Sequence, residues 1–283
     1  MGAILFAVVL EKAAAFADWS CGDLHVHSAP SFDSDVPVDQ RLVSAVAEGL
    51  DVLVPADHDV VGDWQPNDGL LRGADLLVIP GLEITPDTWD MPVEGAHLNV
   101  FPLPSDRHPS DFRIASDSIE SLIDHARSLT GTSLLQLNHP RFAPWNGLFT
   151  TLGLMPASLD PALVDQLPFD AIEVYNGHEL DANVQGDVSD IMQDWFALLN
   201  VGWPAVATGS SDTHRLSGSP VGLPRTCVAS TAGDPESFVD TLRAGHAFVT
   251  NGPALDVTVD GVAPGGLVQP GEPNVQVDVQ VDA

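Results

Sequence analysis

The chain has 283 residues, which is long enough for one large domain, or one domain with a small annex, and for a sizeable core. Its 40 acidic and 10 basic residues give a formal net charge of −30. Such a surface repels nucleic acid and anionic membranes, so we expect neither a nucleic-acid duplex nor a membrane as a partner. We interpret the excess of acid as a solvated surface adapted to a saline environment, where counterions screen its self-repulsion.

The N-terminal residues and the cysteines bear on the compartment. Residues 2–9 form an apolar run that hints at a signal peptide, but Glu11 and Lys12 interrupt it and it is too short to span a bilayer. We therefore expect a soluble protein, and both a cytoplasmic and an exported location stay open. Cys21 and Cys227 are expected to be two separate thiols, because the sequence does not show that their Cα atoms approach within about 7 Å.

Taken in chain order, the sequence alternates apolar strand-like runs with helix-like segments. Strands are predicted over residues 22–27, 50–56, 75–80, 96–101, 133–138, 169–175 and 203–208. Helices are predicted over residues 38–49, 118–129, 188–201 and 235–244, the last opening with the Asp-Pro pair at 234–235. Most strand runs are continuously apolar, as in parallel sheets covered on both faces. Seven strands with intervening helices favour an α/β barrel.

Two regions depart from this alternation. The chain between Glu83 and His97 is too short for a crossover helix, so we expect the flanking segments to be antiparallel or merely adjacent. Residues 140–168 are rich in Pro, Trp and Phe, and we expect them to form a wall of the pocket. The predicted domains are an N-terminal extension over 1–21, a barrel over 22–253, and a β-rich C-terminal segment over 254–283 that stops in mid-strand, as in a fragment of a longer protein.

The first predicted strand carries the clearest chemical signal. Apolar Leu24 and Val26 alternate with His25 and His27, and strand side chains have a period of two, so both imidazoles point to one face. Two histidines at this spacing can chelate one cation, although a pair of ordinary strand histidines is the alternative.

Further metal-ligand candidates recur along the chain, each just past an apolar strand: His58, Glu83, His97, His139, Asp212 and His214. In an α/β barrel, the loops at the carboxyl ends of the strands converge on one mouth. We therefore expect these side chains to meet. Imidazole and carboxylate ligands without thiolate suit Zn, Mn or Fe in a hydrolytic site.

The set of motifs resembles the PHP superfamily, named for its polymerase and histidinol-phosphatase members. The resemblance rests on His-x-His at 25–27, the acidic Asp33 six positions later, Asp-His-Asp at 57–59, Gly-x-Glu-Ile at 81–84, His-Pro at 139–140 and Ser-Asp-x-His at 211–214. It covers residues 22–253. Segments 36–39, 173–177 and 250–253 look like the branch that includes carbaryl hydrolases.

This resemblance implies a distorted (β/α)7 barrel of the PHP type that holds two or three divalent metal ions. Carried over residue by residue, a first metal would be held by His25, His27, Glu83 and Asp212. Glu83 would bridge to a second metal, held also by His97 and His139. A third would be held by Asp33, His58 and His214, where some members have histidine in place of Asp33. The implied reaction is attack of a metal-bridged hydroxide on an ester, with Glu83 and Asp212 at the catalytic centre.

Three further side chains are candidates for substrate contact. Arg141 and Arg215 directly follow ligand motifs and are candidates for bidentate binding of a phosphoryl oxygen; a structural ion pair is the alternative for Arg141. His178, just after the sixth predicted strand, is a candidate for substrate contact or for protonation of a leaving group, with surface placement as the alternative.

The function we predict is a metal-dependent phosphoesterase that cleaves small phosphate mono- or diesters, with a small-molecule, anionic ester as its partner. The alternative is a carboxylester or carbamate hydrolase that uses the same metal centre. A metal-stabilised binding module is a third reading, which the complete set of ligand-type residues disfavours.

The saline-surface hypothesis predicts that stability rises with ionic strength. The Debye length falls from about 10 Å at 0.1 M salt to about 3 Å at 1 M, which screens repulsion between surface carboxylates. The melting temperature should therefore be higher in about 1 M KCl than in about 0.1 M KCl. A melting temperature that does not respond to KCl would contradict the hypothesis.

Overall fold

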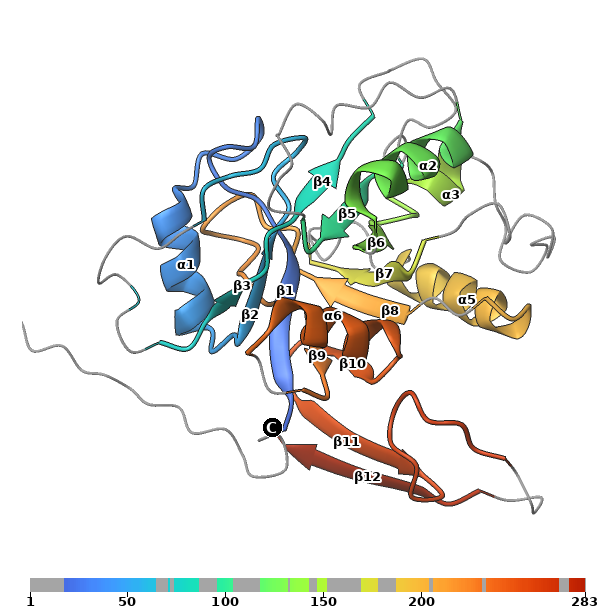
Figure 1. Ribbon diagram of the computed structural model, residues 1–283. Coiled ribbons are helices and arrows are strands. Elements are labelled where there is room, and N and C mark those ends of the chain that lie inside the picture. Colours follow the sequence, from blue (N-terminus) through green and yellow to red (C-terminus); the bar gives the residue numbers. More distant parts are fainter. Residues whose placement is uncertain are drawn as a thin grey trace, which may run out of the picture.

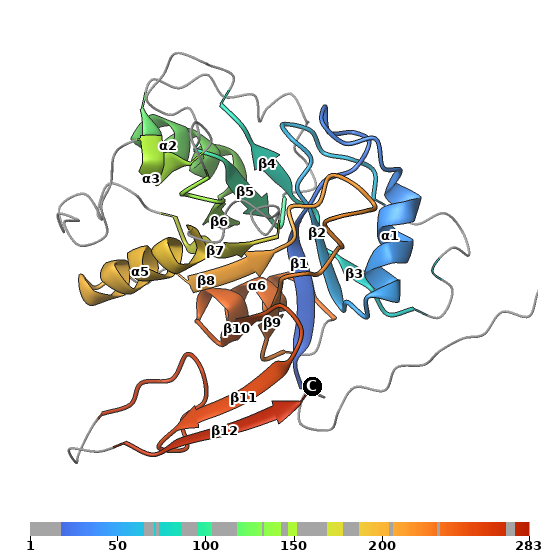
Figure 2. The same cartoon turned by 180° about the vertical axis from the view of Figure 1, so that it is seen from behind.

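The structure is a computed structural model of the chain. It describes residues 18–64, 71, 74–86, 96–103, 118–131, 133–142, 147–151, 169–177, 187–203, 206–230, 233–269 and 275–282. Figure 1 shows the elements in chain order, and Figure 2 shows the same molecule from behind. The fold is mixed α/β, as predicted, with helices packed on the outside of two main sheets.

The first sheet has the strand order β10-β9-β1-β2-β3. Strands β1 (Ser20–Val26), β2 (Val52–Pro55) and β3 (Leu77–Val78) run parallel, whereas β9 (Arg225–Val228) pairs antiparallel with both β1 and β10 (Ala247–Thr250). Strands β1, β2 and β3 overlap segments that the sequence predicts to be strands, whereas β9 was not predicted. A β-strand alternates its side chains, so residues on one face of β1 pack on the helices while His25 faces the other way.

The second sheet has the strand order β4-β5-β6-β7-β8. Strand β5 (Leu98–Phe101) pairs antiparallel with both β4 (Leu82–Ile84) and β6 (Leu134–Leu137). Strands β7 (Ala171–Asn176) and β8 (Val206–Ser210) then continue the sheet parallel to β6. The antiparallel pairing of β4 with β5 confirms one of the two arrangements expected for the short connection between Glu83 and His97.

The helices cover the outer faces of these sheets (Figures 1 and 2). They are α1 (Val38–Ala47), α2 (Ile119–Thr130), α3 (Leu148–Thr151), α5 (Asp187–Asn200) and α6 (Pro235–Arg243). The four longer ones lie where the sequence predicts them. Their starts are capped locally: Ser118 Oγ accepts from the N–H of Ser121, and Asp234 accepts from the N–H of Ser237 ahead of Pro235.

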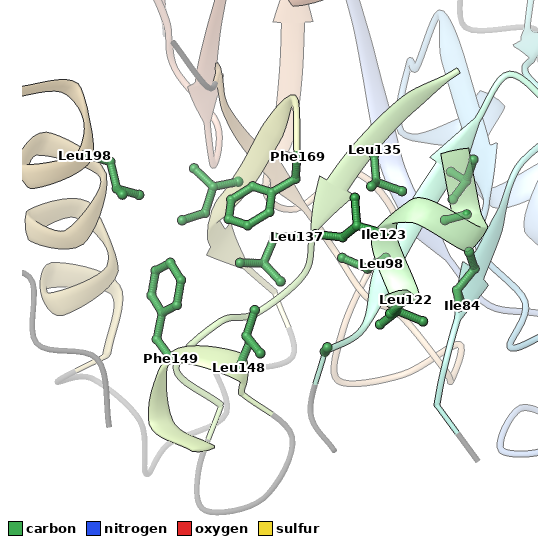
Figure 3. Close-up of a cluster of buried hydrophobic side chains, with 14 of the residues drawn as sticks. Ile84, Leu98, Leu122, Ile123, Leu135, Leu137, Leu148, Phe149, Phe169 and Leu198 are labelled. Atoms are coloured by element: carbon green, nitrogen blue, oxygen red, sulfur yellow. The ribbon is translucent and has the colours of Figure 1, made fainter. Parts of the chain in front are cut away.

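The largest apolar cluster lies between α2, α3, α5 and the second sheet (Figure 3). Leu122 and Ile123 of α2 pack with Leu98 and Leu137 of the sheet, and all four side chains are fully buried. Of two smaller clusters, one packs α6 against strands of both sheets and the other packs α1 against the first sheet. The continuous apolar runs of the strands are therefore explained by burial on both faces.

The distorted (β/α)7 barrel that the resemblance implies is not shown by the structure, because both main sheets are open. The edge of β1 that would face β8 is hydrogen-bonded to β9 from Ser20 to Gly22. In the described residues, isolated bridges link the two sheets from Val26 to Thr213 and from His58 to Glu83, and side-chain hydrogen bonds such as that from Asn99 Nδ2 to the carbonyl of Leu24 add to them. Both bridges involve residues at or beside predicted metal ligands, so the two sheets meet at the candidate site.

A separate hairpin, β11 (Ala254–Val259) with β12 (Val277–Asp282), projects below the sheets in Figure 1. Its antiparallel strands agree with the alternation seen in the sequence. The domain boundaries at residues 21 and 253 stay a prediction. Among the helices of the described residues, none has the length and apolar character that crossing a bilayer requires.

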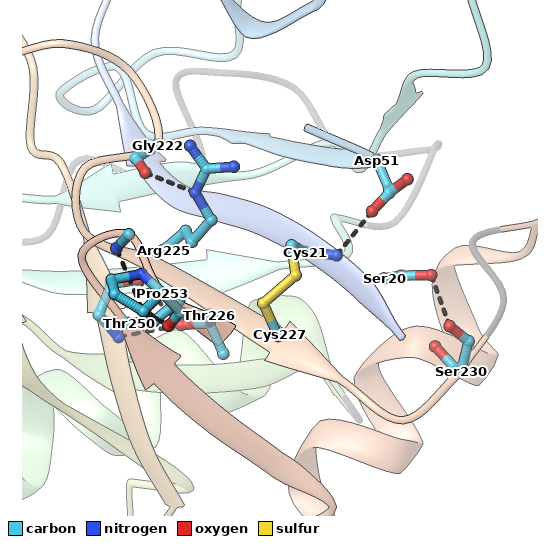
Figure 4. Close-up of a disulfide and its surroundings, with 12 residues drawn as sticks. Ser20, Cys21, Asp51, Gly222, Arg225, Thr226, Cys227, Ser230, Thr250 and Pro253 are labelled. Carbon is cyan, nitrogen blue, oxygen red and sulfur yellow. Dashed lines mark hydrogen bonds between the residues drawn. A yellow bond between two sulfur atoms is a disulfide. The ribbon is translucent and has the colours of Figure 1, made fainter. Parts of the chain in front are cut away.

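Cys21 and Cys227 form a disulfide between β1 and β9 (Figure 4), so the prediction of two separate thiols is wrong. Their Cα atoms lie 4.0 Å apart because the two residues are direct partners in the antiparallel register of these strands. The sequence reasoning missed the pairing because it missed β9. The disulfide joins the strand that carries His25 to a strand more than 200 residues later.

Cys227→Ser should lower the free energy of unfolding by about 2–5 kcal/mol, because the cross-link restricts a long loop in the unfolded chain. Denaturant unfolding measures the change. The wild-type protein in reducing agent should lose the same stability, whereas the variant should not respond to the reductant. An unchanged unfolding curve in the variant would show that the disulfide does not stabilise the fold.

Candidate metal centre

Glu83 of β4 lies at the centre of the candidate site, and the other predicted ligands surround it. The first sheet supplies His25 and His27 at the end of β1, Asp33 in the loop after β1, and His58 just after β2. The second sheet supplies His97 just before β5, His139 just after β6, and Asp212 and His214 just after β8. The structure therefore brings together residues that are far apart in the sequence: His25 and His214 are separated by 214 − 25 = 189 positions. That these side chains bind metal stays a prediction.

The two carboxylate oxygens of Glu83 have different surroundings. Oε2 is buried and has no hydrogen-bond partner among the described residues, yet the nitrogens His25 Nε2, His27 Nε2 and His58 Nδ1 lie 3.3, 3.4 and 3.1 Å away. A buried, anionic oxygen without a donor is costly unless a cation reaches it.

Oε1 of Glu83 lies on the side of His97 and His139, at 3.1 Å from His97 Nδ1 and 3.5 Å from His139 Nε2. It also accepts a 2.8 Å hydrogen bond from Asn138 Nδ2, whose amide is linked to the buried side chain of Asn99. These amides fix the orientation of the carboxylate, so that Oε2 faces the imidazoles of His25 and His27.

Two further carboxylates complete the cluster. Asp212 Oδ1 lies 3.0 Å from His27 Nε2 and 3.3 Å from His25 Nε2. Asp33 Oδ2 lies 3.1 Å from His58 Nε2 and 3.0 Å from His214 Nε2. Each carboxylate therefore faces two imidazole nitrogens.

Hydrogen bonds on the far side of each ring indicate its tautomer. His25 Nδ1 lies 3.1 Å from Glu173 Oε1, and a carboxylate can only accept, so Nδ1 carries the proton. His214 Nδ1 donates to the carbonyl of Asp212 at 2.9 Å. The Nε2 atoms of both rings are left with a lone pair directed at carboxylate oxygens.

His27 follows the same pattern through a serine. Ser31 Oγ donates to Asp33 Oδ1 at 2.8 Å and therefore accepts from His27 Nδ1, which lies 3.3 Å away. His27 Nε2 then also presents a lone pair to Asp212. Nitrogen lone pairs about 3 Å from carboxylate oxygens repel unless a proton or a metal ion lies between them. The donor set thus fits divalent cations.

Three groups of side chains have ligand atoms within 4.8 Å of one another: His27 with Asp33, His58 and His214; His25 with His27 and Asp212; and His58 with Glu83 and His97. Each group overlaps one ligand set that the family resemblance implies. His139 is in none of the groups, although its Nε2 approaches Glu83. The residues themselves therefore suggest that the site binds divalent cations.

Charge within the cluster shifts several pKa values. Burial favours the neutral form of Glu83, but the surrounding imidazoles, led by His58 and His25, hold its pKa well below the usual range. Burial lowers the pKa of His27 to about 3. Burial acts in the same direction on His139, but its hydrogen bond to Glu83 and the charge of Asp212 raise its pKa to about 9. The nearby carboxylates thus favour the protonated form of His139, whereas burial favours the neutral form of His27.

Two of the predicted ligands adopt strained backbone conformations. His139 has φ of 24° and Asp212 has φ of 49°, a region that residues with a side chain rarely occupy. The backbone N–H of Asp212 donates to the carbonyl of His25 at 2.9 Å, which holds the two ligands side by side. Strain of this kind is tolerated where surrounding structure imposes it and is concentrated at functional sites.

Glu173 of β7 is a positioning residue that the sequence analysis did not assign. It is fully buried, and besides His25 it accepts from the N–H of His139 at 2.9 Å and from Asn176 Nδ2 at 2.8 Å. Asn176 Nδ2 also lies 3.1 Å from Asp212 Oδ2. The signal for Glu173 was available, since it is an acidic residue in an otherwise apolar strand next to the proposed site.

The cluster lines a cavity of about 530 Å³. The walls include the ligands Asp33, His58, Glu83, His97, His139, Asp212 and His214, together with Phe142, Gly177 and the loop residues Arg215, Ser217, Gly218 and Ser219. Phe32, 79% exposed, stacks on the ring of His58 at 4.8 Å. The cavity is therefore large enough for a small organic ester and has aromatic side chains beside its polar floor.

The structure places the three candidates for substrate contact in different surroundings. Arg215 lines the cavity, as its predicted role requires. Arg141 makes a bidentate ion pair with buried Asp194, at 2.6 and 2.9 Å, which is the structural alternative weighed for it, and its role in binding substrate stays untested. His178 lies outside the described residues, as does most of the 140–168 segment.

No family model and no curated protein matches the sequence, but solved structures match its fold. A two-domain protein from Bacteroides vulgatus, containing a predicted PHP-like metal-dependent phosphoesterase, matches 83% of this chain with a TM-score of 0.50 and 20% identity; the chain spans 66% of that protein. PsfC from Pseudomonas syringae matches 82% of this chain and 91% of its own, with a TM-score of 0.55 and 16% identity. The chain therefore shares a fold with a PHP-like protein.

The third comparison corrects one prediction. Endonuclease Q, solved as a complex with a 27-mer duplex substrate that has an abasic lesion at the active site, matches 80% of this chain and 56% of its own, with a TM-score of 0.46 and 15% identity. The prediction that a nucleic-acid duplex is not a partner is contradicted by this finding and is wrong. Net charge is a sum over the whole surface, it is screened beyond about 8 Å at physiological ionic strength, and it does not exclude a local contact.

Loss of a ligand or of its positioning residue should reduce metal binding. His25→Ala should lower the number of divalent ions that the protein retains after purification without chelator. Glu173→Gln should weaken metal affinity by about 10- to 100-fold, because it replaces the carboxylate that accepts the hydrogen bond from His25 Nδ1 with a neutral amide. Metal analysis by mass spectrometry and metal titration measure both effects. His125→Ala, at an exposed position of α2, is the matched control and should retain all metal. Equal metal content in all variants would contradict the site.

Proposed function

We propose that the protein is a metal-dependent hydrolase of the PHP superfamily that cleaves small phosphate mono- or diesters. The observation that carries this proposal is the buried cluster around Glu83, in which imidazole lone pairs and carboxylate oxygens lie about 3 Å apart with no donor to Glu83 Oε2 among the described residues. The shared fold with a PHP-like protein supports the same assignment. An ester hydrolase is the reaction class that this ligand set and fold support together.

Charge favours an anionic ester as the substrate. Three divalent cations would bring six positive charges, against three negative charges from Asp33, Glu83 and Asp212, while the imidazoles bind as neutral ligands. The bound centre would therefore carry excess positive charge at the floor of the cavity. A phosphate ester balances that charge better than a neutral ester does.

When bound, divalent cations supply Lewis-acid chemistry, because they lower the pKa of water to about 7 and stabilise negative charge on the reacting ester. The protein residues do the rest. Glu83 and Asp212 would hold the positive charge in place, and Glu173 and Asn176 fix the orientation of His25 and Asp212. Burial of His25, His27 and Glu83 keeps bulk water away from these side chains. No separate side-chain base is needed in this scheme.

The finer assignments belong to the same proposal. We assign the chain to the carbaryl-hydrolase-like branch on segments 173–177 and 250–253, and we propose Mn, Zn or Fe as the metal, with two or three ions bound. Glu173 and Asn176 of the first segment contact the cluster, which supports its functional importance. We also propose that the two bridged sheets correspond to the distorted (β/α)7 barrel of that family.

A rate panel tests the function. Metal-reconstituted protein should hydrolyse p-nitrophenyl phosphate or bis-p-nitrophenyl phosphate, and His25→Ala or Asp212→Ala should lose almost all of this activity because each removes a ligand-type side chain from the centre. The matched control, His125→Ala, should keep it.

The same panel separates the other functions. Turnover of p-nitrophenyl acetate or 1-naphthyl methylcarbamate without turnover of phosphate esters would replace the proposal with a carboxylester or carbamate hydrolase. Cleavage of a duplex with an abasic site, in preference to the small phosphate esters, would replace the small-molecule substrate with nucleic acid. Full activity in Asp212→Ala would overturn the assignment of the centre.

A further inference from the structure

Arg215 is distinctive among the arginines of the described residues. The side chains of the others are hydrogen-bonded or ion-paired to the protein: Arg41, Arg127, Arg141, Arg225 and Arg243. The guanidinium of Arg215 has no hydrogen bond or ion pair within the described ranges, and the residue is exposed. In a chain with a net charge of −30, an uncommitted cation is unusual.

The position of Arg215 is fixed although its side chain is not committed. Its carbonyl oxygen accepts from Arg41 Nη1 at 3.1 Å and from Thr213 Oγ1 at 2.9 Å. Arg41 is itself buried and also donates to the carbonyls of His27 and Thr213, which belong to the candidate metal centre or directly adjoin it. The backbone of Arg215 is therefore anchored to the segment that carries Asp212 and His214.

The loop that follows Arg215 forms one wall of the cavity. Ser217, Gly218 and Ser219 line it together with Arg215, and the same cavity is lined by carboxylates and imidazoles of the centre. Gly218 has φ of 97°, a conformation that suits glycine, and Ser219 is held by Thr213 Oγ1, which lies 2.6 Å from its carbonyl oxygen. Within the described ranges, the N–H groups of Leu216, Ser217 and Gly218 make no hydrogen bond to the protein. The hydroxyl of Ser219 donates to the carbonyl of Ser211 at 3.3 Å, so the wall residues offer the guanidinium of Arg215, the hydroxyl of Ser217 and backbone N–H groups.

We propose that residues 215–219 form an anion subsite, and that Arg215 is the specificity-determining residue that selects phosphate esters over neutral esters. The subsite binds a non-bridging phosphoryl oxygen of the substrate. The guanidinium is the donor best matched to a phosphoryl group, because its planar N–H groups reach two oxygens at once. The overall negative charge of the protein repels anions, so attraction of an anionic substrate has to come from this local donor set and the metal centre.

This inference rests on the proposed function and makes it more specific. In the competing reading, a carboxylester or carbamate hydrolase, the substrate is neutral and an uncommitted arginine at the cavity wall has no group to bind. The substrate preference of Arg215 variants therefore separates the two readings, and binding of inorganic phosphate tests the subsite without any turnover.

The experiment compares wild type, Arg215→Met, Arg215→Lys and Arg243→Met. Methionine keeps most of the apolar volume and removes the charge, lysine keeps the charge but loses the bidentate geometry, and Arg243→Met makes the same change in net charge on α6, away from the cavity. Two quantities are measured on metal-reconstituted protein: the ratio of kcat/KM for p-nitrophenyl phosphate to that for p-nitrophenyl acetate, and the affinity for inorganic phosphate by calorimetry.

We expect Arg215→Met to lower both the ratio and the phosphate affinity by about 10- to 100-fold, the range for loss of a hydrogen bond to a charged group. Arg215→Lys should fall between wild type and Arg215→Met, and Arg243→Met should match wild type. Unchanged phosphate affinity in Arg215→Met, or an equal loss in Arg243→Met, would overturn the subsite.

Failure of the subsite and failure of the function give different results. A wild type that hydrolyses p-nitrophenyl phosphate, with Arg215→Met equally active and equally able to bind phosphate, leaves the function standing and rejects the subsite. A wild type that hydrolyses no phosphate ester, yet binds inorganic phosphate at least 10-fold better than Arg215→Met does, rejects the function and supports the subsite.

Discussion

The site depends on one electrostatic constraint: the buried carboxylates of Glu83 and Asp212 and the exposed carboxylate of Asp33 share one cluster with several imidazole lone pairs. Glu83, Asp212 and Asp33 each face ring nitrogens at about 3 Å, and the far nitrogens of His25, His27 and His214 are occupied by Glu173, Ser31 and a backbone carbonyl. Such an arrangement is stable only with cations among the ligand atoms, whether protons or metal ions. The cluster is therefore suited to binding cations, because bound cations remove the repulsion between the imidazole lone pairs and the carboxylate oxygens.

The fold meets this constraint by bringing two open sheets together at the site. Strand β1 divides one edge between two partners: its first residues pair with β9, and its last residue bridges to Thr213 beyond β8. Arg41 of α1 strengthens the same junction, because its guanidinium donates to the carbonyls of His27 and Thr213. Burial lowers the pKa of Arg41 to about 10, and at neutral pH the residue stays charged. A buried cation thus ties together the backbone segments that carry ligands from both sheets.

The sequence allowed the ligand-type residues, the main helices and most strands to be predicted, because each depends on a local pattern: an apolar run, a cap, or a ligand directly after a strand. What it did not reveal depends on pairing between distant segments. Strand β9 is short and reads as ordinary loop sequence, so its pairing with β1, the Cys21–Cys227 disulfide and the interrupted barrel were all missed together. Arg141 illustrates the same limit, because only the fold places Asp194 beside it.

The distribution of the few basic residues links the acidic composition to the site. Cations are scarce in this chain, and in the described residues five of the six arginines are committed to holding the fold: Arg41 at the junction of the sheets, Arg141 on Asp194, and Arg127, Arg225 and Arg243 on carbonyls or carboxylates. The sixth, Arg215, lies at the cavity wall. Because the net charge of the chain is −30, the position of an uncommitted guanidinium beside the candidate metal centre is informative: it adds positive potential where bound metal ions would also add it. The proposed specificity for an anionic ester is compatible with the acidic composition. Repulsion by the net charge acts over the whole molecule and is screened by salt, whereas binding of the ester would act by direct contact.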